Sequence, residues 1–378
     1  MKKSIKHSIK IAAATLLIAT LMIGQFPLGV QQVSAAVKLT PNVLTTGSDA
    51  ELKNSSHYTF DSDGFQLYTL TIPADGCLVA YLSAQYADYV NVEIHKKADG
   101  SDLPTAFAFQ CTTDRNNFDT NNRYLTKGTY YLRFPANSYI LDMDLFSSAP
   151  KTLKDGSTVA AYCDYNTEDV FTYRAPETGY ITLTQKRLIN TGASYDVVLC
   201  NKKESKLSDV VCDHDIERDV IFPVKKGVTY KIKVKTLNVD GQQFYRMNLN
   251  FTKRIEKSGS SKSKAVKATI SSYTHGMIFS EDALSRKDWY KFSNPKSQNL
   301  SLTALGFATS GSIDFTVYNS KGKAIGIYHL MPGNEKGNTV ELVNINGKRT
   351  HPKGTYYVSV KKTRKETAGI YSFKIVKK

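Results

Sequence analysis

The stretch "KGTYYLRF" at residues 127–134 recurs as "KGTYYVSV" at residues 353–360, and "KKGVTYKIKV" at residues 225–234 is a looser third copy. Each copy begins with a Lys-Gly turn and continues with an apolar residue at every second position. A period of two with aromatic and β-branched residues is typical of a strand with one buried face. The stretch therefore predicts a half-buried β-strand that occurs three times in the chain.

The alternation in these strands predicts which side chains fill a core. A glycine at the turn favours a backbone conformation that other residues resist, and the extra residue between Gly227 and Tyr230 predicts a β-bulge in the middle copy. The predicted inward residues are Tyr130, Leu132 and Phe134 in the first copy, Tyr230, Ile232 and Val234 in the second, and Tyr356, Val358 and Val360 in the third.

Two further signals repeat in the same order around these strands. One is an alternating strand, a Pro turn and a second alternating strand; the other is a short apolar strand between that signal and the Lys-Gly turn. No helical periodicity persists after the first 35 residues. Many short strands joined by turns are typical of β-sandwiches. We therefore predict an all-β fold of three tandem jelly-roll-like β-sandwich modules. The first signal is "YTLTIPADGCLVA" (68–80), "FTYRAPETGYITL" (171–183) and "YKFSNPKSQNLSL" (290–302).

The first 35 residues have the pattern of a secretory signal peptide. Four lysines precede an apolar run at residues 11–23 that is short for a membrane span, and small residues precede a cleavage point after Ala35 or Ala36. No later stretch is apolar enough to span a membrane. We therefore expect an exported protein, secreted or associated with the cell wall, without a transmembrane anchor. The predicted organisation is a signal peptide (1–35), module 1 (40–148), module 2 (149–255), a flexible polar linker (256–264) and module 3 (265–378).

The net charge of +16 is concentrated in the last third of the chain. Residues 256–378 contain 21 Lys and Arg against 8 Asp and Glu, whereas residues 37–148 contain 8 against 13. Outside a cell, such a basic excess favours anionic polymers, such as cell-wall phosphates or acidic glycans, over nucleic acid. A basic surface that only keeps the protein soluble is the alternative.

The five cysteines do not predict a disulfide framework. Their number is odd and none lies at a matched position of the repeats, although export permits disulfides. We expect at most one bridge in each module, with Cys77–Cys111 as one possibility.

Module 3 resembles the bacterial pre-peptidase C-terminal domain family around "SRKDWYKFSNP" at residues 285–295. That family shows a glycine, a short strand, an acidic residue, Trp or a similar aromatic, Tyr, and Phe two positions after the Tyr. The stretches "EDVFTYRAP" (168–176) and "DGFQLYTL" (63–70) are thinner forms of the same pattern. The matching residues in module 3 are Gly276, Asp288, Trp289, Tyr290 and Phe292.

The resemblance implies a small, non-catalytic, extracellular β-sandwich of a kind that is commonly appended to secreted hydrolases. Some members of the family bind matrix protein or polysaccharide, and some bind calcium through an acidic segment at the start of the domain. In this chain we find no hydrolase domain, and the segment before module 3 is basic and Ser-rich, with Glu256 alone as an acidic residue. The resemblance therefore implies a binding module whose calcium segment is not matched.

No motif of a known catalytic centre occurs in the chain. His-Glu-x-x-His, Gly-x-Ser-x-Gly, a phosphate-binding glycine loop and Cys-x-x-Cys are all missing from the sequence. Carboxylate pairs that cleave glycosidic bonds need no local motif, so a hydrolase is not excluded. Two polar stretches, residues 112–123 and 212–219, are candidate calcium or other metal sites, with solvated turns as the alternative. Their candidate ligands are Asp114, Asn116 and Asp119 in the first stretch, and Asp213, His214 and Asp215 in the second.

The outward side of the strand after the Pro turn differs between the modules. Modules 2 and 3 show Thr and Ser there, whereas module 1 shows Cys77, Val79 and Tyr81. Tyr131 also points outward, where module 2 has Lys231. An apolar outer face indicates a contact surface, and tyrosine suits such surfaces because it combines a flat apolar area with a polar tip. Val79, Tyr81 and Tyr131 are therefore candidate ligand-binding residues, with packing against module 2 as the alternative.

A second candidate binding site is the basic stretch "KKTRKE" at residues 361–366, a predicted hairpin tip before the last strand. Lysine and arginine bind sulfate, sialate and phosphate groups through charge-assisted hydrogen bonds. The candidate residues are Lys361, Lys362, Arg364 and Lys365.

These features together predict a secreted binding or adhesion protein that is not an enzyme and needs no cofactor. Its expected partner is an extracellular macromolecule, either a host glycoprotein or a polysaccharide, and basic module 3 helps to hold it at an anionic surface polymer. Three weak sites would add avidity if the linker lets them engage together. The alternatives are a secreted hydrolase or an enzyme-associated accessory subunit, and a structural cell-surface component.

Overall fold

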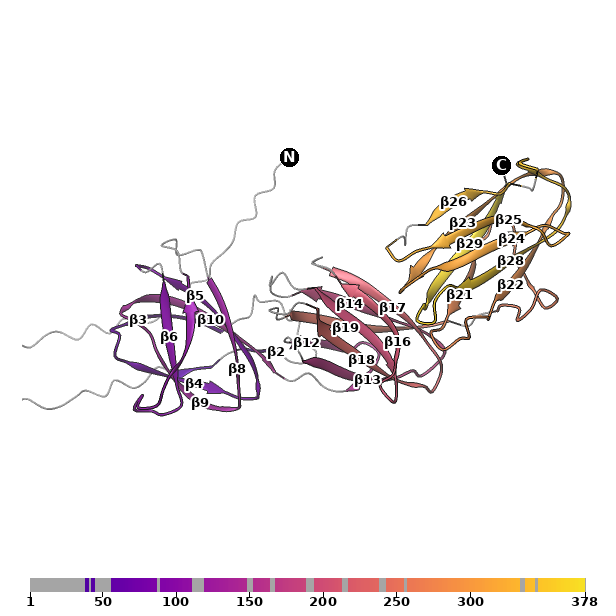
Figure 1. Ribbon diagram of the computed structural model, residues 1–378. Helices are drawn as coiled ribbons and strands as arrows, with labels where there is room; N and C mark the ends of the chain where they lie inside the picture. Colours follow the sequence, from indigo (N-terminus) through magenta and orange to yellow (C-terminus); the bar gives the residue numbers. More distant parts are fainter. Residues whose placement is uncertain are drawn as a thin grey trace, which may run out of the picture. The chain divides into compact units, whose positions relative to one another are not determined.

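The computed structural model consists of β-strands without helices in the residues that it describes (Figure 1). These residues accordingly include no helix long and apolar enough to cross a membrane. The predicted signal peptide lies outside them, and residues 37–378 form one compact unit. The structure describes residues 38–40, 42–44, 56–86, 89–110, 119–147, 152–163, 167–187, 194–212, 217–237, 243–254, 257–333, 337–343 and 346–377.

Module 1 is a sandwich of two sheets. Its strands are β1 (Lys38–Leu39), β2 (Asn42–Leu44), β3 (Ser56–Ser62), β4 (Leu67–Ile72), β5 (Gly76–Ala84), β6 (Val90–His95), β7 (Thr105–Phe109), β8 (Asp119–Leu125), β9 (Gly128–Arg133) and β10 (Asn137–Ser147). One sheet has the order β1-β4-β9-β6-β7, and the other has the order β2-β10-β5-β8, with β3 also pairing with β10. Apolar residues from both sheets form one core.

Module 2 repeats this arrangement. Its strands are β11 (Thr152–Leu153), β12 (Thr158–Cys163), β13 (Glu168–Arg174), β14 (Gly179–Arg187), β15 (Tyr195–Asn201), β16 (Lys206–Cys212), β17 (Glu217–Val224), β18 (Thr229–Thr236) and β19 (Gln243–Lys253). The first sheet has the order β11-β13-β18-β15-β16, and the second has the order β12-β19-β14-β17. The core again lies between the two sheets.

Module 3 has the same two-sheet plan. Its strands are β20 (Val266–Lys267), β21 (Thr274–Ile278), β22 (Asp288–Asn294), β23 (Gln298–Ala308), β24 (Ile313–Tyr318), β25 (Ala324–Leu330), β26 (Asn338–Glu341), β27 (Thr350–His351), β28 (Gly354–Lys362) and β29 (Gly369–Lys377). The first sheet has the order β20-β22-β28-β24-β25, and the second has the order β21-β29-β23-β26, with β27 also pairing with β23.

The repeated sequence stretches form the same strand in each module. They become β9, β18 and β28, and each of these is the central strand of a five-stranded sheet. The predicted fold class, all-β with tandem β-sandwich modules, is therefore confirmed. The chain spells "KGTYY" twice because a central strand and its preceding turn are repeated.

The inward residues of the central strands are buried as the alternation predicted. Tyr230, Ile232 and Val234 have no exposed surface, and neither do Val358 and Val360. Each module gathers such residues from both of its sheets into one apolar cluster. The removal of this apolar surface from water is the dominant favourable contribution to the folding of each sandwich.

The Lys-Gly turns agree with the prediction in one module only. Gly227 has a φ of 73°, in the left-handed region that favours glycine. Gly128 and Gly354 do not have a positive φ, because they are already the first residues of β9 and β28. The extra residue of the middle copy lies in the turn before β18, and the ladder between β13 and β18 has no register shift. The predicted β-bulge is therefore wrong, since the turn absorbs the extra residue.

A buried hydrogen-bond network connects β22 to β29 in module 3. Tyr371 Oη donates to Asp288 Oδ2 at 3.0 Å and lies 2.9 Å from Tyr290 Oη. Asp288 also accepts a hydrogen bond from Arg286 at 3.2 Å, so the buried carboxylate has the partners that burial requires. Gly276 lies opposite Tyr371, where an added Cβ would come within 2.1 Å of the ring. The glycine, the aspartate and the tyrosine singled out in the sequence thus belong to one packing arrangement.

The other two modules keep the tyrosine on the last strand and change its neighbours. In module 2, Tyr245 Oη donates to Asp169 at 2.6 Å, and Ala161 occupies the position opposite the tyrosine. In module 1, Tyr139 lies opposite Phe60, and their ring centroids are 5.7 Å apart. Phe60 thus takes the position of the glycine, and the Tyr139 hydroxyl donates to the carbonyl oxygen of Pro135 at 2.9 Å instead of to a carboxylate. Both changes agree with the thinner family pattern in the sequence of module 1.

The segment predicted to be a flexible linker packs on module 3. Gly259 exchanges two backbone hydrogen bonds with Trp289, at 3.0 and 2.9 Å. Ser258 Oγ donates to Asp288 at 2.8 Å. Residues 257–264 therefore form part of the third sandwich, and the prediction of a flexible linker is wrong for them because backbone and side-chain hydrogen bonds hold them against β22.

Candidate functional site

The outer face of β5, predicted to contact a ligand, is covered by module 2. Cys77 and Val79 have no exposed surface and form an apolar cluster with Phe146, Ala160 and Phe244. The rings of Phe146 and Phe244 lie 4.9 Å apart. Because Ala160 is on β12 and Phe244 is on β19, this cluster joins two modules. Val79 is therefore not accessible to a ligand, and packing against module 2 explains why its face is apolar. We call this cluster the covered face.

Tyr81 and Tyr131 do not form a common surface. Tyr81 is half-buried against the covered face, and its hydroxyl has no hydrogen-bond partner among the described residues. Burial, together with Asp144 and Asp142, raises the pKa of Tyr81. Tyr131 is half-buried on β9, which belongs to the other sheet of the sandwich. Ligand binding at either tyrosine stays a prediction.

Strand alternation divides the predicted basic site at residues 361–366. Lys362 follows the inward residues of β28 and is 2% exposed. Its Nζ donates to the carbonyl oxygens of Phe279, Ser280 and Lys365 at 3.2, 2.7 and 2.8 Å, and burial lowers the pKa of Lys362. The prediction that Lys362 binds an anion is corrected, because three carbonyl oxygens already occupy its ammonium group.

The other three basic residues of this stretch remain at the surface. Lys361 is half-buried on the outward side of β28, opposite Asp314 of β24. Arg364 and Lys365 are exposed in the turn that follows. The structure therefore separates the predicted cluster into one residue on a sheet face and two in a loop, and their binding of anions stays a prediction.

The candidate metal ligands lie outside the residues whose side chains are described, and so does Cys111, the suggested partner of Cys77. Within the described ranges, no group of three His, Cys, Asp or Glu side chains is placed to hold a metal ion. Calcium binding at the two polar stretches therefore stays a prediction. The undescribed candidate side chains are Asp114, Asn116, Asp119, Asp213, His214 and Asp215.

The outward side of the first sheet of module 3 has three aromatic rings on neighbouring strands. Trp289 of β22, Tyr357 of β28 and Tyr318 of β24 are all half-buried. The ring centroids of Trp289 and Tyr318 are 5.5 Å apart, and Tyr318 lies opposite Tyr357 in the ladder. Aromatic rings held in this way offer a flat apolar area with polar edges.

Lysines surround these rings. Lys262 Nζ lies 4.7 Å from the centroid of the Tyr357 ring, and Lys287 Nζ lies 6.0 Å from that of Trp289. Lys291 lies opposite Tyr357 in the ladder between β22 and β28. Cations near the faces of aromatic rings are attracted to them, so the rings and the charges form one surface. We call this surface the Trp289 face; its residues are Trp289, Tyr318, Tyr357, Lys262, Lys267, Lys287 and Lys291.

The sequence contained a signal for part of this surface. The alternation of "KGTYYVSV" places Tyr357 outward in the same way as Tyr131, so the sequence indicates this ring by the same rule. Trp289 belongs to the family pattern, and that pattern alone does not indicate a binding role. Tyr318 could not be assigned to this face without knowing that β24 lies next to β28.

A cavity of about 310 Å³ adjoins Trp289. Within it, Arg286 is engaged by two carboxylates, Asp282 at 2.8 Å and Asp288 at 3.2 Å. The remaining polar groups are serine residues and Lys287. The cavity is lined by Ser258, Ser260, Ser285, Arg286, Lys287, Asp288 and Trp289.

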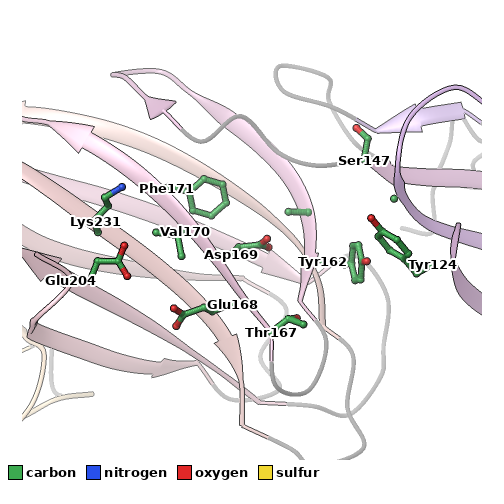
Figure 2. Close-up of a pocket in the computed structure, with 12 residues that line it drawn as sticks. Tyr124, Ser147, Tyr162, Thr167, Glu168, Asp169, Val170, Phe171, Glu204 and Lys231 are labelled. Atoms are coloured by element: carbon green, nitrogen blue, oxygen red, sulfur yellow. The ribbon is translucent and has the colours of Figure 1, made fainter. Parts of the chain in front are cut away.

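A larger cavity of about 490 Å³ lies beside the covered face (Figure 2). Figure 2 shows the rings of Tyr124 and Tyr162 next to each other, and the carboxylates of Glu168 and Glu204 farther along the cavity. The centroids of the two rings are 6.3 Å apart. Its lining residues are Gly76, Tyr124, Ser147, Ala161, Tyr162, Thr167, Glu168, Asp169, Val170, Phe171, Glu204 and Lys231.

The three carboxyl groups of this larger cavity have different environments. Lys233 Nζ bonds to Glu168 at 2.5 Å and to Glu204 at 2.9 Å, and these contacts lower the pKa of Glu204. Burial raises the pKa of Asp169 to about 6, an effect that the hydrogen bond from Tyr245 opposes. Carboxylate pairs that hydrolyse glycosides face each other across the scissile bond. Because one lysine holds two of these three groups, the arrangement favours a structural ion-pair network.

Residues 286–362 match the family model described as the bacterial pre-peptidase C-terminal domain. Module 3 thus matches a known family. The matched range contains the Asp-Trp-Tyr-Phe pattern of β22 and the whole of β28, so the resemblance noted in the sequence is confirmed, most clearly in the C-terminal part. The match fits a non-catalytic extracellular accessory module and identifies no catalytic family.

Three solved structures are similar to parts of the chain at low sequence identity. The pre-peptidase C-terminal domain of collagenase from Bacillus anthracis is 15% identical, with a TM-score of 0.23, and the match covers 33% of this chain and 99% of that chain. Tripeptidyl peptidase 2 is 10% identical, with a TM-score of 0.24, over 90% of this chain and 32% of that chain. The CBM22-1–CBM22-2 tandem domain of Xyn10C from Paenibacillus barcinonensis is 8% identical, with a TM-score of 0.19, and the match covers 53% of this chain and 87% of that chain. At these TM-scores the likenesses carry no argument about function. Among curated proteins, none matches the chain.

Proposed function

We propose that this protein is a secreted, non-catalytic binding protein whose Trp289 face engages an extracellular polysaccharide. The match of module 3 to a family of accessory domains supports the binding role, and the signal peptide predicted at residues 1–35 supports export. The observation that carries the proposal is the set of three partly exposed rings on adjacent strands of one sheet.

Rigid rings on a sheet suit a polymer of sugars for a physical reason. The backbones of Trp289 and Tyr357 are hydrogen-bonded within the sheet, so only the side-chain rotamers of these rings lose freedom when a ligand binds. A sugar ring presents an apolar face that can stack on an aromatic ring while its hydroxyl groups stay in water. Repeated sugar units can then use several rings of the Trp289 face at once.

The proposal is tested with Trp289→Ala in the full-length mature chain. Retention is measured on an array of polysaccharides and extracellular glycoproteins, and the melting temperature is measured in parallel. We expect the affinity for the retained polysaccharide to fall at least about tenfold, because the largest ring of the surface is lost. Tyr86→Ala is the matched control, since Tyr86 is 75% exposed on module 1 and should not affect retention.

The result can contradict the proposal in two ways. Unchanged polysaccharide affinity in a folded Trp289→Ala variant would exclude the Trp289 face as the binding surface. Retention on glycoproteins after their glycans are removed, with none on polysaccharides, would replace the proposed ligand by a host protein.

A further inference from the structure

The lysines of the Trp289 face continue the row of rings across the sheet. Lys267 of β20 lies opposite Lys291 of β22, and Lys291 lies opposite Tyr357 of β28. Tyr357 in turn lies opposite Tyr318 of β24. Residues directly opposite each other in neighbouring strands share one side of a sheet. The row therefore runs from two ammonium groups to two tyrosine rings across four strands.

The positive charge of this row is not compensated within the described part of the chain. None of the four lysines of the Trp289 face forms an ion pair with a described carboxylate. The outward lysines of module 2 differ, since Lys233 bonds two glutamates and Lys235 lies 3.8 Å from Asp196. Lys267 and Lys291 are exposed and directly opposite each other, so a ligand of opposite charge would relieve the repulsion between their ammonium groups.

The small cavity beside Trp289 extends the same surface with polar groups. It is lined by Ser258, Ser260 and Ser285, and its Arg286 is already engaged by carboxylates. Its volume of about 310 Å³ lies at the lower end of the range for ligand pockets, about 300–1,000 Å³. Serine residues next to an aromatic ring suit the hydroxyl groups of a sugar unit whose face lies on that ring.

We infer that the Trp289 face binds an acidic polysaccharide, with sugar rings stacked on Trp289 and Tyr357 and carboxylate or sulfate groups paired with Lys262 and Lys291. This inference rests on the proposed function and names the chemical class of its ligand. Charge complementarity favours an acidic polymer, because ammonium groups form charge-assisted hydrogen bonds with such groups. The rings favour a polymer of sugars over one of phosphate alone.

The test compares retention of the full-length mature protein on dextran sulfate, polygalacturonate and neutral dextran. We expect retention on the acidic polymers and none on dextran; retention on only one acidic polymer identifies sulfate or carboxylate as the acid group. Retention should be lost when the salt concentration is raised to about 0.5 M, where the Debye length is about 4 Å. The double variant Lys262→Gln and Lys291→Gln should lower the affinity for the acidic polymer about tenfold.

The matched control is the double variant Lys296→Gln and Lys353→Gln, which removes the same charge from exposed loops of module 3. Equal losses in the two double variants would overturn the inference, because they would show a non-specific effect of net charge. Equal retention on polyphosphate that Trp289→Ala does not change would also overturn it, because the rings would then contribute nothing.

The inference and the proposed function fail in distinguishable ways. Retention on neutral dextran that Trp289→Ala abolishes, but that the variant at Lys262 and Lys291 leaves unchanged, would overturn the acidic class and leave the proposed function standing. No retention on any polysaccharide would overturn both.

Discussion

Outward-pointing residues are buried in module 1 and partly exposed in module 3. On β5, Val79 has no exposed surface, because Phe244 of module 2 contributes to the cluster around it. On β22 and β28, Trp289 and Tyr357 stay partly exposed and have lysines beside them. All three strands follow the same period of two. The difference therefore lies in what covers each sheet, and this is a property of the whole chain.

The composition of the two faces agrees with these environments. Cys77, Val79 and Phe146 are apolar, and the carboxyl group of Asp144, which lies opposite Val79 in the ladder, is fully buried beside them. The Trp289 face is surrounded by lysines, and removing an ammonium group from water without a partner costs several kcal/mol. A mainly apolar outward face thus suits permanent packing, whereas an aromatic face with exposed lysines suits a ligand that brings the opposite charge.

The largest loss of stability that we expect comes from a substitution on the covered face. Phe146→Ala should lower the free energy of unfolding by about 3 kcal/mol, because a buried ring is replaced by a cavity. Ile327→Ala is the comparison on the open sheet of module 3, where Ile327 is 53% exposed, and it should cost less than about 0.5 kcal/mol. Both values are measured by urea unfolding. Equal costs in the two variants would show that module 2 does not cover β5 in solution.

A smaller change in stability is expected when the pH changes the ionisation of Asp169, which lies beside the covered face. Its pKa of about 6 is above its ordinary value of 3.8, so between these values the folded state holds a proton that the unfolded state has released. Stability should therefore fall as the pH rises from about 4 to about 6 and then stay lower, by about 2 kcal/mol.

Asp169→Asn isolates this effect, because it keeps an acceptor for Tyr245 and removes the ionisation. Urea unfolding of the original protein and of the variant at about pH 4 and about pH 8 measures the difference between them. We expect the advantage of the variant to grow with pH. An advantage that does not depend on pH would mean that Asp169 is hydrated in the folded protein.

The smallest effect concerns one hydroxyl group at the edge of the covered face. Tyr81→Phe should leave stability unchanged or raise it by up to about 1 kcal/mol, because the buried hydroxyl has no partner among the described residues. Tyr357→Phe is the matched change on the open face and should be neutral. Thermal unfolding of both variants measures this. A clear loss of stability in Tyr81→Phe would reveal a hydrogen bond at that hydroxyl.

Strand alternation alone predicts the orientation of Lys362 and of Tyr357. The same period that buries Val358 and Val360 also turns Lys362 inward, yet its charge led to a prediction of exposure. Tyr357 was assignable to the outward side by the same rule. The bond between Asp288 and Tyr371 was not predictable, because it joins residues 83 positions apart whose strands meet only in the folded module. The Ser-rich composition of residues 257–264 likewise suggested a linker, because composition does not reveal backbone bonds to Trp289.

The sequence by itself determined that the chain has three similar modules, that their central strands follow a Lys-Gly turn, and which residues of those strands face the core. These features are local, since side chains alternate between the two sides of any extended strand and apolar ones leave water. Only the tertiary structure decided that module 2 covers β5, and that Trp289, Tyr318 and Tyr357 meet on one open face. Those outcomes depend on the order of strands in a sheet and on which sheets pack together, and both are set by contacts between residues far apart in the chain.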